Sequence, residues 1–388
     1  MQFAERVKQL PPYLFVGISR AIAEKKKQGI DVISFGIGDP DIPTPHTVIE
    51  ELKKSSEISA NHRYPETEGL PEYRASVAKF YKNRFGVDLD PESQIINLIG
   101  AKEGIAHAPL CFIDPGDIAI CPNPAYPVYE IGTMFAGGEC HMVNLEESKN
   151  YLLDPTDIPS DIAKRAKILW INYPNNPTGA CADISYFENI VNFCKQYDIA
   201  LLHDACYTEV TFDGYIAPSI LEVDGAMDIC MEFHSLSKTA NMTGWRVGTA
   251  VGNTEMINAL MRVKSNIDSG LPQAIQQMGI SAFNLSKDWL FHNNEIYRKR
   301  RDKIVNVLNS IGVKTSTPKA GLYIWTPIPD GFTSAEFATK LLEEVNVVVT
   351  PGNGYGSAGE GYIRLSLTIP DDQIDEGLNR LSKFRINS

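Results

Sequence analysis

Residues 235–248 of the chain are Ser-Leu-Ser-Lys-Thr-Ala-Asn-Met-Thr-Gly-Trp-Arg-Val-Gly, and an apolar run lies at each end of this stretch. The runs at 229–233 and 247–251 have the length of buried strands. We therefore expect Lys238 in a loop at the end of a strand, where α/β enzymes place their chemistry. A lysine there can hold an aldehyde cofactor as a Schiff base, although an ordinary solvated loop would have a similar composition.

The chain up to residue 285 alternates between short apolar runs and helical segments. Strands are expected at 95–99, 117–121, 140–143, 168–172 and 199–204. Helices are expected at 70–85, 100–112, 128–135 and 184–197. This alternation is typical of an α/β fold in which helices cover both faces of a large, mostly parallel sheet.

The pattern changes after residue 285. A long helix is expected at 289–308, followed by strands at 322–327, 347–349 and 362–367, a helix at 334–345 and a last helix from about Asp371. This order is typical of a smaller α+β domain. We place a large domain at 46–285 and a small domain at 286–388 together with 1–45, in which the prolines make 11–15 an extended arm. The basic run at 298–301 is expected to be a solvated helix face.

Composition narrows the class of protein. The 388 residues are 43% hydrophobic and carry a formal net charge of -12, which argues against a nucleic-acid or anionic-membrane partner. No apolar run approaches the ~20 residues that span a bilayer, and no secretory signal is recognisable. The seven cysteines have no zinc-ligand spacing, so we expect no metal site and reduced thiols in a cytoplasmic protein.

Polar groups that follow the predicted strands match the needs of pyridoxal phosphate. This cofactor requires a lysine, a phosphate cup, a carboxylate at its ring nitrogen, a donor to its ring hydroxyl and a stacking ring. Lys238, Asp204 and Tyr207 are the candidates for the lysine, the carboxylate and the donor. The further candidates are Asn176 for the ring hydroxyl, Tyr126 for stacking, and Ala101, Lys102, Ser235, Ser237 and Arg246 for the phosphate. Each of these taken alone could also be a helix cap, a turn residue or a core aromatic.

The glycine pair in Gly36-Ile37-Gly38 does not indicate a nucleotide site. It lacks the third glycine of the dinucleotide-binding fingerprint, and the prolines that follow at 40, 43 and 45 prevent a helix from starting there. The pair instead predicts a tight turn whose backbone can approach a ligand closely.

Several motifs together resemble the class I/II aminotransferases, which are fold-type-I pyridoxal-phosphate enzymes. The motifs are Asn-Asn-Pro-Thr-Gly at 175–179, Asp204-x-x-Tyr207, Ser235-x-Ser-Lys238, Arg246 and Arg364, and they are collinear over nearly the whole chain. The resemblance implies that Lys238 is the Schiff-base lysine and the general acid/base, with Asp204 and Tyr207 as its catalytic partners. It also implies that Arg364 binds the substrate α-carboxylate, and that Gly38 makes a backbone contact near it.

The same resemblance implies a homodimer with shared active sites, because Tyr64 matches a tyrosine that reaches the cofactor phosphate of the partner subunit. Within the family, the chain is most similar to the LL-diaminopimelate aminotransferases, on the basis of Gly100-Ala101-Lys102, the Tyr13 arm and Lys264-Ser-Asn266-Ile-Asp-Ser-Gly270. This similarity implies LL-2,6-diaminopimelate and 2-oxoglutarate as substrates in lysine biosynthesis. The implied substrate-binding residues are Tyr13, Gly38, Lys102, Tyr126, Asn176, Asn266 and Arg364.

Two questions stay open at the level of sequence. Either Glu66 or Glu68 could reach the distant ammonium of the substrate from the partner subunit, or both could cap the helix near Leu70; the chain has Tyr64-Pro65 where the family usually has Tyr-Gly. The core motifs also fit an aspartate- or alanine-type aminotransferase or a β-lyase. A non-catalytic regulator on this scaffold is disfavoured by the complete lysine, aspartate and arginine set and by the acidic charge.

Overall fold

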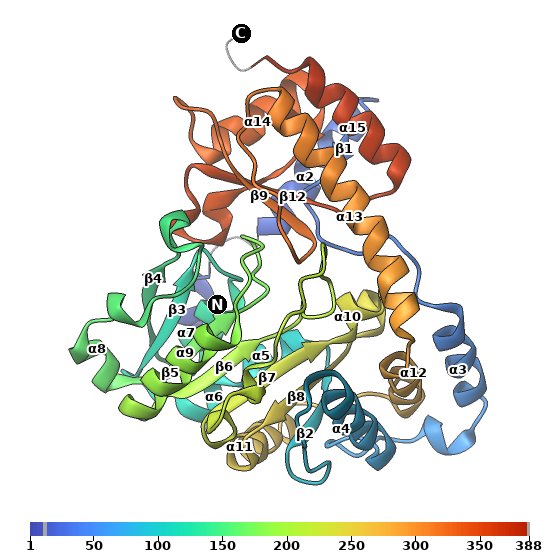
Figure 1. The fold of residues 1–388 in the computed structure, drawn as a ribbon, viewed down its shortest axis with the longest axis vertical. Coiled ribbons are helices and arrows are strands. Elements are labelled where there is room, and N and C mark those ends of the chain that lie inside the picture. Colours follow the sequence, from blue (N-terminus) through green and yellow to red (C-terminus); the bar gives the residue numbers. More distant parts are fainter. Residues whose placement is uncertain (11–13, 386–388) are drawn as a thin grey trace.

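The computed structural model describes residues 1–10 and 14–385, and Tyr13 therefore lies outside the described residues. A seven-stranded sheet forms the centre of the lower part of the molecule in Figure 1, with the strand order β2-β8-β7-β6-β5-β3-β4. Its strands are β2 (Ile95–Ile99), β3 (Ile118–Asn123), β4 (Glu139–Asn144), β5 (Ala166–Asn172), β6 (Ala200–Asp204), β7 (Cys230–Ser235) and β8 (Val247–Gly252). The pairings of β8 with β2 and β7 are antiparallel and the other four are parallel, so the predicted mostly parallel sheet is confirmed.

Helices cover both faces of this sheet, because its strands are apolar on both sides. Along β5, Ile168 and Trp170 belong to one hydrophobic core, whereas Leu169 and Ile171 belong to the other. The first core is covered by α5 (Ala101–His107), α6 (Pro109–Phe112), α7 (Val128–Ala136) and α11 (Thr254–Ser265). The second is covered by α4 (Pro71–Phe85), α9 (Ile184–Tyr197) and α12 (Gln273–Phe283). The helix α3 (His46–Ser56) packs on α12, and α8 (Ser160–Arg165) precedes β5.

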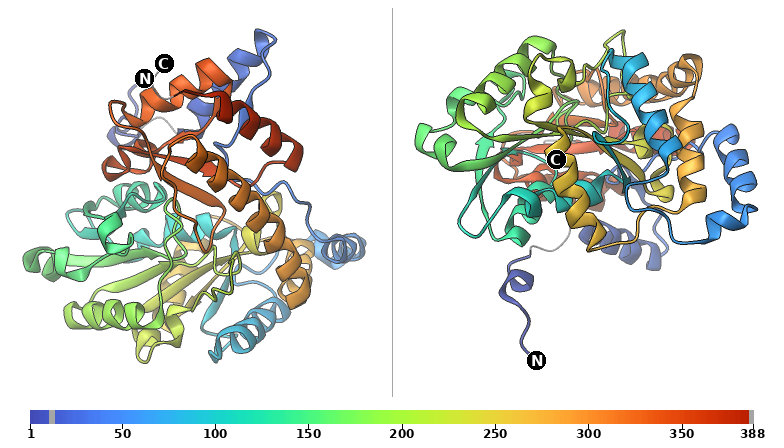
Figure 2. Two further views of the ribbon diagram at one scale, coloured as in Figure 1. Left: turned by 45° about the horizontal axis from the view of Figure 1, so that its top comes forward. Right: turned by 90° about the horizontal axis from the view of Figure 1, so that it is seen from below.

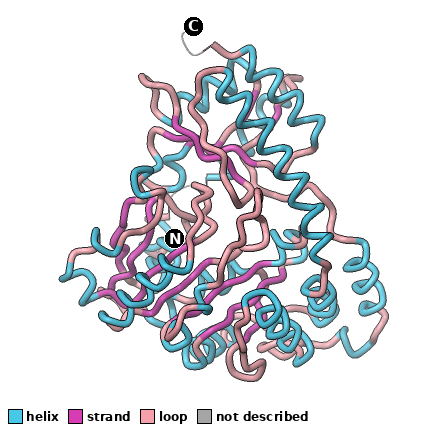
Figure 3. The backbone as a smooth tube through the Cα atoms, viewed as in Figure 1, coloured by secondary structure: helices cyan, strands magenta, loops and turns pink. Residues whose placement is uncertain are grey.

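A second group of strands lies above the large sheet, as the magenta segments of Figure 3 show. Here β9 (Tyr323–Pro327), β12 (Tyr362–Ser366) and β11 (Thr350–Pro351) form an antiparallel sheet. The strand β1 (Ile33–Ser34) pairs with β10 (Val347–Val348), so a segment from the first part of the chain joins strands from its last part here. The helices are α2 (Leu14–Lys27), α14 (Ser334–Val345), α15 (Asp371–Lys383) and α13 (Lys287–Ser310), which also extends down to the large sheet. The domain limits stay a prediction.

The N-terminal segment differs in part from expectation. Leu14 and Phe15 begin α2, so the extended arm expected at 11–15 does not include them. Before it, α1 (Glu5–Lys8) buries none of its residues and projects from the body of the molecule (Figure 2). Among the described residues, no helix is both long and apolar enough to cross a membrane.

The expectation for the basic run on α13 is wrong for two of its residues. Arg300 and Arg301 are almost fully buried, not solvated. Arg300 donates to Asp41 at 2.6 Å and to Asp371 at 2.8 Å. Arg301 likewise pairs with Asp213. The free-energy cost of burying a guanidinium falls when carboxylates surround it. These carboxylates come from distant parts of the chain, so the local sequence did not reveal them as partners of the helix.

The two kinds of arginine on α13 should differ in their effect on stability. Arg300→Met should lower the free energy of unfolding by about 2 kcal/mol, because Asp41 loses a charged partner at a mostly buried position. Arg298→Met should change it by less than ~0.5 kcal/mol, because Arg298 pairs with Glu295 and Asp302 at the helix surface. Urea unfolding of both variants would measure this, and equal losses would contradict the assignment.

Candidate active site

A cavity of about 370 Å³ lies at the carboxyl ends of β5, β6 and β7, beneath the small antiparallel sheet. Carboxyl ends of parallel strands meet at one edge of a sheet, which is why residues so distant in sequence come together there. The sequence-predicted site residues that line the cavity are Gly38, Ala101, Lys102, Tyr126, Asn176, Asp204, Tyr207, Ser235, Ser237, Lys238, Arg246 and Arg364. The structure thus gathers most of the predicted set in one place.

Lys238 lies in a short helix and not in the loop that we expected. The helix α10 (Leu236–Thr239) starts directly after β7, because the Ser235 hydroxyl accepts a hydrogen bond from the Ser237 backbone N–H. The Lys238 amine donates to the backbone oxygen of Gly38 at 3.0 Å. The tight turn predicted around Gly38 therefore brings its backbone directly to the lysine.

Asp204 ends β6 and keeps its carboxylate buried. One carboxylate oxygen accepts from the Tyr129 hydroxyl at 2.7 Å, and the other accepts from the Cys206 backbone N–H at 3.2 Å. Burial, followed by the charge of Asp204, raises the pKa of Tyr129 well above its usual value, so this hydroxyl stays protonated and donates. Two donors thus fix the orientation of the carboxylate at the cavity wall.

Arg246 lies beside the turn between β2 and α5. A Cβ atom on Gly100, whose φ is +73°, would lie 2.4 Å from an Arg246 guanidinium nitrogen. Only glycine therefore lets the guanidinium approach the backbone that leads to Ala101 and Lys102. With Ser235 and Ser237 on the same cavity, the donors here are a guanidinium, two hydroxyls and backbone N–H groups, a set suited to a phosphate.

Arg364 lies on β12 and is buried beside the cavity. It donates to the Asn176 side-chain oxygen at 2.9 Å and to the Gly36 backbone oxygen at 3.0 Å. Its guanidinium carbon lies 3.8 Å from the ring centre of Tyr323 and 4.8 Å from that of Tyr355. Asn176, Gly36 and the two rings hold the guanidinium in one orientation.

Sequence reasoning missed Tyr129, Tyr323 and Tyr355. The Tyr323 hydroxyl lies 3.1 Å from the Tyr207 hydroxyl. A Cβ atom on Gly38 would lie only 2.1 Å from the Tyr323 hydroxyl. Burial alone would raise the pKa of Tyr323, but the charges of Arg364 and Lys238 lower it. Tyr129 lies in an expected helix and Tyr323 in an expected strand, whereas Tyr355 lies between the strands expected at 347–349 and 362–367. None of these positions separates a site tyrosine from a structural one.

Among the described residues of the single chain, two predicted site residues do not line this cavity. Tyr64 is 88% exposed on the segment before α4. Asn266 is exposed at the end of α11, where its amide donates to the Arg262 backbone oxygen. Tyr13 is outside the described residues. The roles implied for these residues stay predictions.

Comparison with known proteins places this geometry in a family. Residues 30–381 match the family described as aminotransferase class I and II. The chain belongs to this family. It is 56% identical to the LL-diaminopimelate aminotransferase of Dehalococcoides mccartyi strain BAV1, with all of both chains covered. It is 51% identical to that of Moorella thermoacetica, over 99% of this chain and 98% of the relative. The substrate-bound BacF structure from Bacillus subtilis superposes with a TM-score of 0.95 at 34% identity, over 99% of this chain and 98% of that chain.

The protein is accordingly a pyridoxal-phosphate-dependent aminotransferase with the fold-type-I architecture. The residues of its cavity fit that cofactor, because they include an amine, an oriented carboxylate and a cluster of hydrogen-bond donors suited to a phosphate. Burial raises the pKa of Tyr207 well above its usual value, so this hydroxyl is protonated and able to donate. Because residue 100 is a glycine, the Arg246 guanidinium can lie directly beside the backbone at the start of α5.

Proposed function

We propose that this aminotransferase transfers the amino group of LL-2,6-diaminopimelate to 2-oxoglutarate, a step of lysine biosynthesis. The observation that carries the proposal is the meeting of Lys238, Asp204 and Arg364 at one cavity, in a chain more than half identical over its full length to relatives named for this activity. The matched length leaves no large segment of either chain unaccounted for.

Substrate binding begins with the guanidinium of Arg364. A guanidinium presents paired N–H groups that match the two oxygens of an α-carboxylate. Asn176 and Gly36 hold the group from one side, and the rings of Tyr323 and Tyr355 restrict its motion. The carboxylate therefore binds in one orientation, which sets the α-carbon toward Lys238.

Lys238 moves the proton in this proposal. Bound pyridoxal phosphate withdraws electrons from the α-carbon and so makes its proton acidic. The Lys238 amine accepts that proton from one face and returns it at a neighbouring position, while the Gly38 backbone oxygen keeps the amine in place. Asp204 would interact with the ring nitrogen of the bound cofactor, and Tyr129 and the Cys206 N–H already orient its carboxylate for this.

The other residues of the cavity hold the cofactor. Ser235, Ser237 and Arg246 would bind its phosphate together with the backbone N–H groups of Ala101 and Lys102. Tyr126 would stack on its ring, and Tyr207 and Asn176 would contact its ring hydroxyl. Lys102, Tyr126 and Asn176 also face the substrate, since they line the same cavity.

The active protein in this proposal is a cytoplasmic homodimer. Tyr64 at 88% exposure, Phe3 at 65% and Val7 at 51% leave large apolar side chains in solvent near the arm and the segment before α4. A second copy would cover them, and Tyr64 would reach the partner's phosphate. Tyr13, Asn266 and one of Glu66 and Glu68 would contact the distant end of the substrate.

A half-reaction assay tests the substrate. The visible absorbance of the cofactor joined to Lys238 is followed while single amino acids are added to the purified holoenzyme. LL-diaminopimelate and glutamate should each remove this absorbance, whereas aspartate and alanine should leave it nearly unchanged, because only the first two match the proposed donor and the product of the proposed acceptor. Loss with aspartate or alanine, and none with diaminopimelate, would contradict the substrate while leaving the family assignment intact.

Subunit mixing tests the shared site. Lys238→Ala and Tyr64→Ala should each lose most activity as pure proteins. A refolded equal mixture should recover up to about a quarter of wild-type activity, because half of the dimers are mixed and each has one complete site. As a control, a mixture of Lys238→Ala with Asp204→Ala should recover nothing, since both residues belong to the same subunit's site. No recovery in the first mixture would show that Tyr64 does not act across the dimer.

A further inference from the structure

Lys264 on α11 is a buried charge that the proposed mechanism does not use. Its side chain is fully buried, and its ammonium lies 3.1 and 3.0 Å from the two carboxylate oxygens of Glu103. It also lies 2.8 Å from a carboxylate oxygen of Asp268. A lysine is seldom buried unless its charge is paired, so this cluster has a specific structural purpose.

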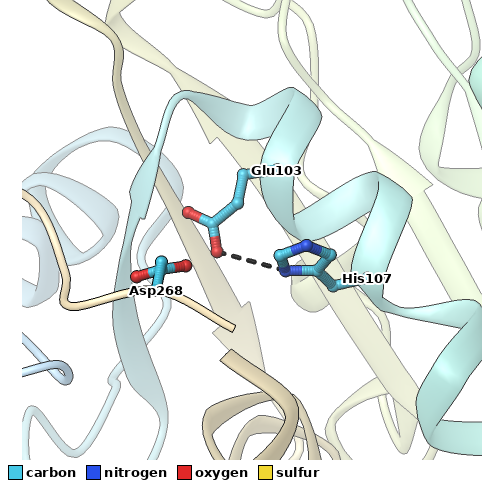
Figure 4. Close-up of side chains that lie close together, drawn as sticks. All are labelled: Glu103, His107 and Asp268. Atoms are coloured by element: carbon cyan, nitrogen blue, oxygen red, sulfur yellow. Dashed lines mark ion pairs between the residues drawn. The ribbon is translucent and has the colours of Figure 1, made fainter. Parts of the chain in front are cut away.

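The cluster has the composition of a metal site but holds its own cation. Figure 4 shows Glu103 and His107 on α5, with Asp268 opposite them, and the ligand atoms of the three residues lie within 4.8 Å of one another. The ammonium of Lys264 bonds to both carboxylates. It therefore supplies the positive charge that draws these acidic groups together, and the cluster is an internal ion pair network.

Glu103 connects this network to the cavity. One of its oxygens also accepts from the Ile99 backbone N–H at 2.6 Å. Ile99 ends β2, and Glu103 lies in the first turn of α5, so the carboxylate closes the turn that contains Gly100, Ala101 and Lys102. Ala101 and Lys102 line the cavity. Lys264 thus fixes the orientation of the carboxylate that shapes this turn.

Asp268 extends the network in the other direction. The oxygen that contacts Lys264 also accepts from the Gly270 backbone N–H at 2.7 Å. A Cβ atom on Gly270 would lie 3.2 Å from the Glu66 backbone oxygen, so this loop packs directly on the segment that follows Tyr64. Partial burial would raise the pKa of Asp268, but hydrogen bonds from Lys264 and Gly270 lower it, which keeps the carboxylate charged.

We propose that Lys264 is a positioning residue for the cofactor phosphate: through Glu103 it holds the turn at 100–102, and through Asp268 it holds the segment beside Tyr64. The inference rests on the proposed function, because it takes the turn at 100–102 as part of the phosphate cup. Lys264 itself does not line the cavity.

The test compares two ligands that differ only in the phosphate. Binding of pyridoxal phosphate and of pyridoxal to the full-length apoprotein is measured by quenching of tryptophan fluorescence. Lys264→Met, which keeps the length of the side chain, should weaken pyridoxal phosphate binding about tenfold or more, because the turn loses a hydrogen bond between charged groups. Pyridoxal binding should stay within about twofold of wild type, since only the phosphate contacts are displaced.

Glu103→Gln keeps the shape of the side chain and should give the same selective loss. The double variant should lose little more than either single variant, because both changes break one interaction. If Lys264→Met does not fold, Glu103→Gln and Asp268→Asn carry the same measurement.

Arg301→Met is the matched control, because it also removes a buried, doubly paired cation, but its partners Asp213 and Asp302 do not belong to the turn at 100–102. It should lower the unfolding temperature and leave the ratio of the two binding constants unchanged. The inference would be overturned if Lys264→Met left the ratio of the two binding constants unchanged, whether it weakened the binding of both ligands equally or of neither. If the wild-type protein itself bound pyridoxal phosphate no more tightly than pyridoxal, the proposed function would fail first.

Discussion

The hydrogen bond from Tyr129 to Asp204 is the interaction on which the geometry of the active site depends. A carboxylate buried at the end of a central strand is costly unless donors satisfy it, and Tyr129 and the Cys206 N–H do so from fixed positions. Tyr129 stacks in turn on Trp170 of β5, with ring centres 4.8 Å apart. The packed interior of the sheet therefore sets the direction in which the carboxylate faces the cavity.

The upper part of the molecule completes the site by bringing distant segments against that edge of the sheet. Arg364 and Tyr323 lie on neighbouring antiparallel strands, and Gly36 and Gly38 follow the N-terminal strand β1. The Arg300 ion pair with Asp41 joins the segment after Gly38 to α13. Arg364 and Lys238 are thus held by different layers, and both contact the turn at 36–38.

Local signals made much of this arrangement predictable. The helices Ile184–Tyr197 and Ser334–Val345 have the predicted bounds, because Asp183 caps the first and Thr333 with Glu336 forms a capping box at the second. The cavity residues that were predicted follow strands or belong to recognisable motifs. The rest depends on contacts distant in sequence: Tyr129 meets Asp204, Tyr323 meets Tyr207, and Arg300 meets Asp41. No local pattern encodes such pairs.

The proposed function depends on Lys238 as the residue that carries the cofactor. The most direct measurement is to reduce the holoenzyme with borohydride, which converts a Schiff base into a stable bond, and then to locate the modified residue by mass spectrometry of its peptides. We expect one modified lysine per chain, at Lys238. Modification at Lys102, which lines the same cavity, or at no lysine, would contradict it.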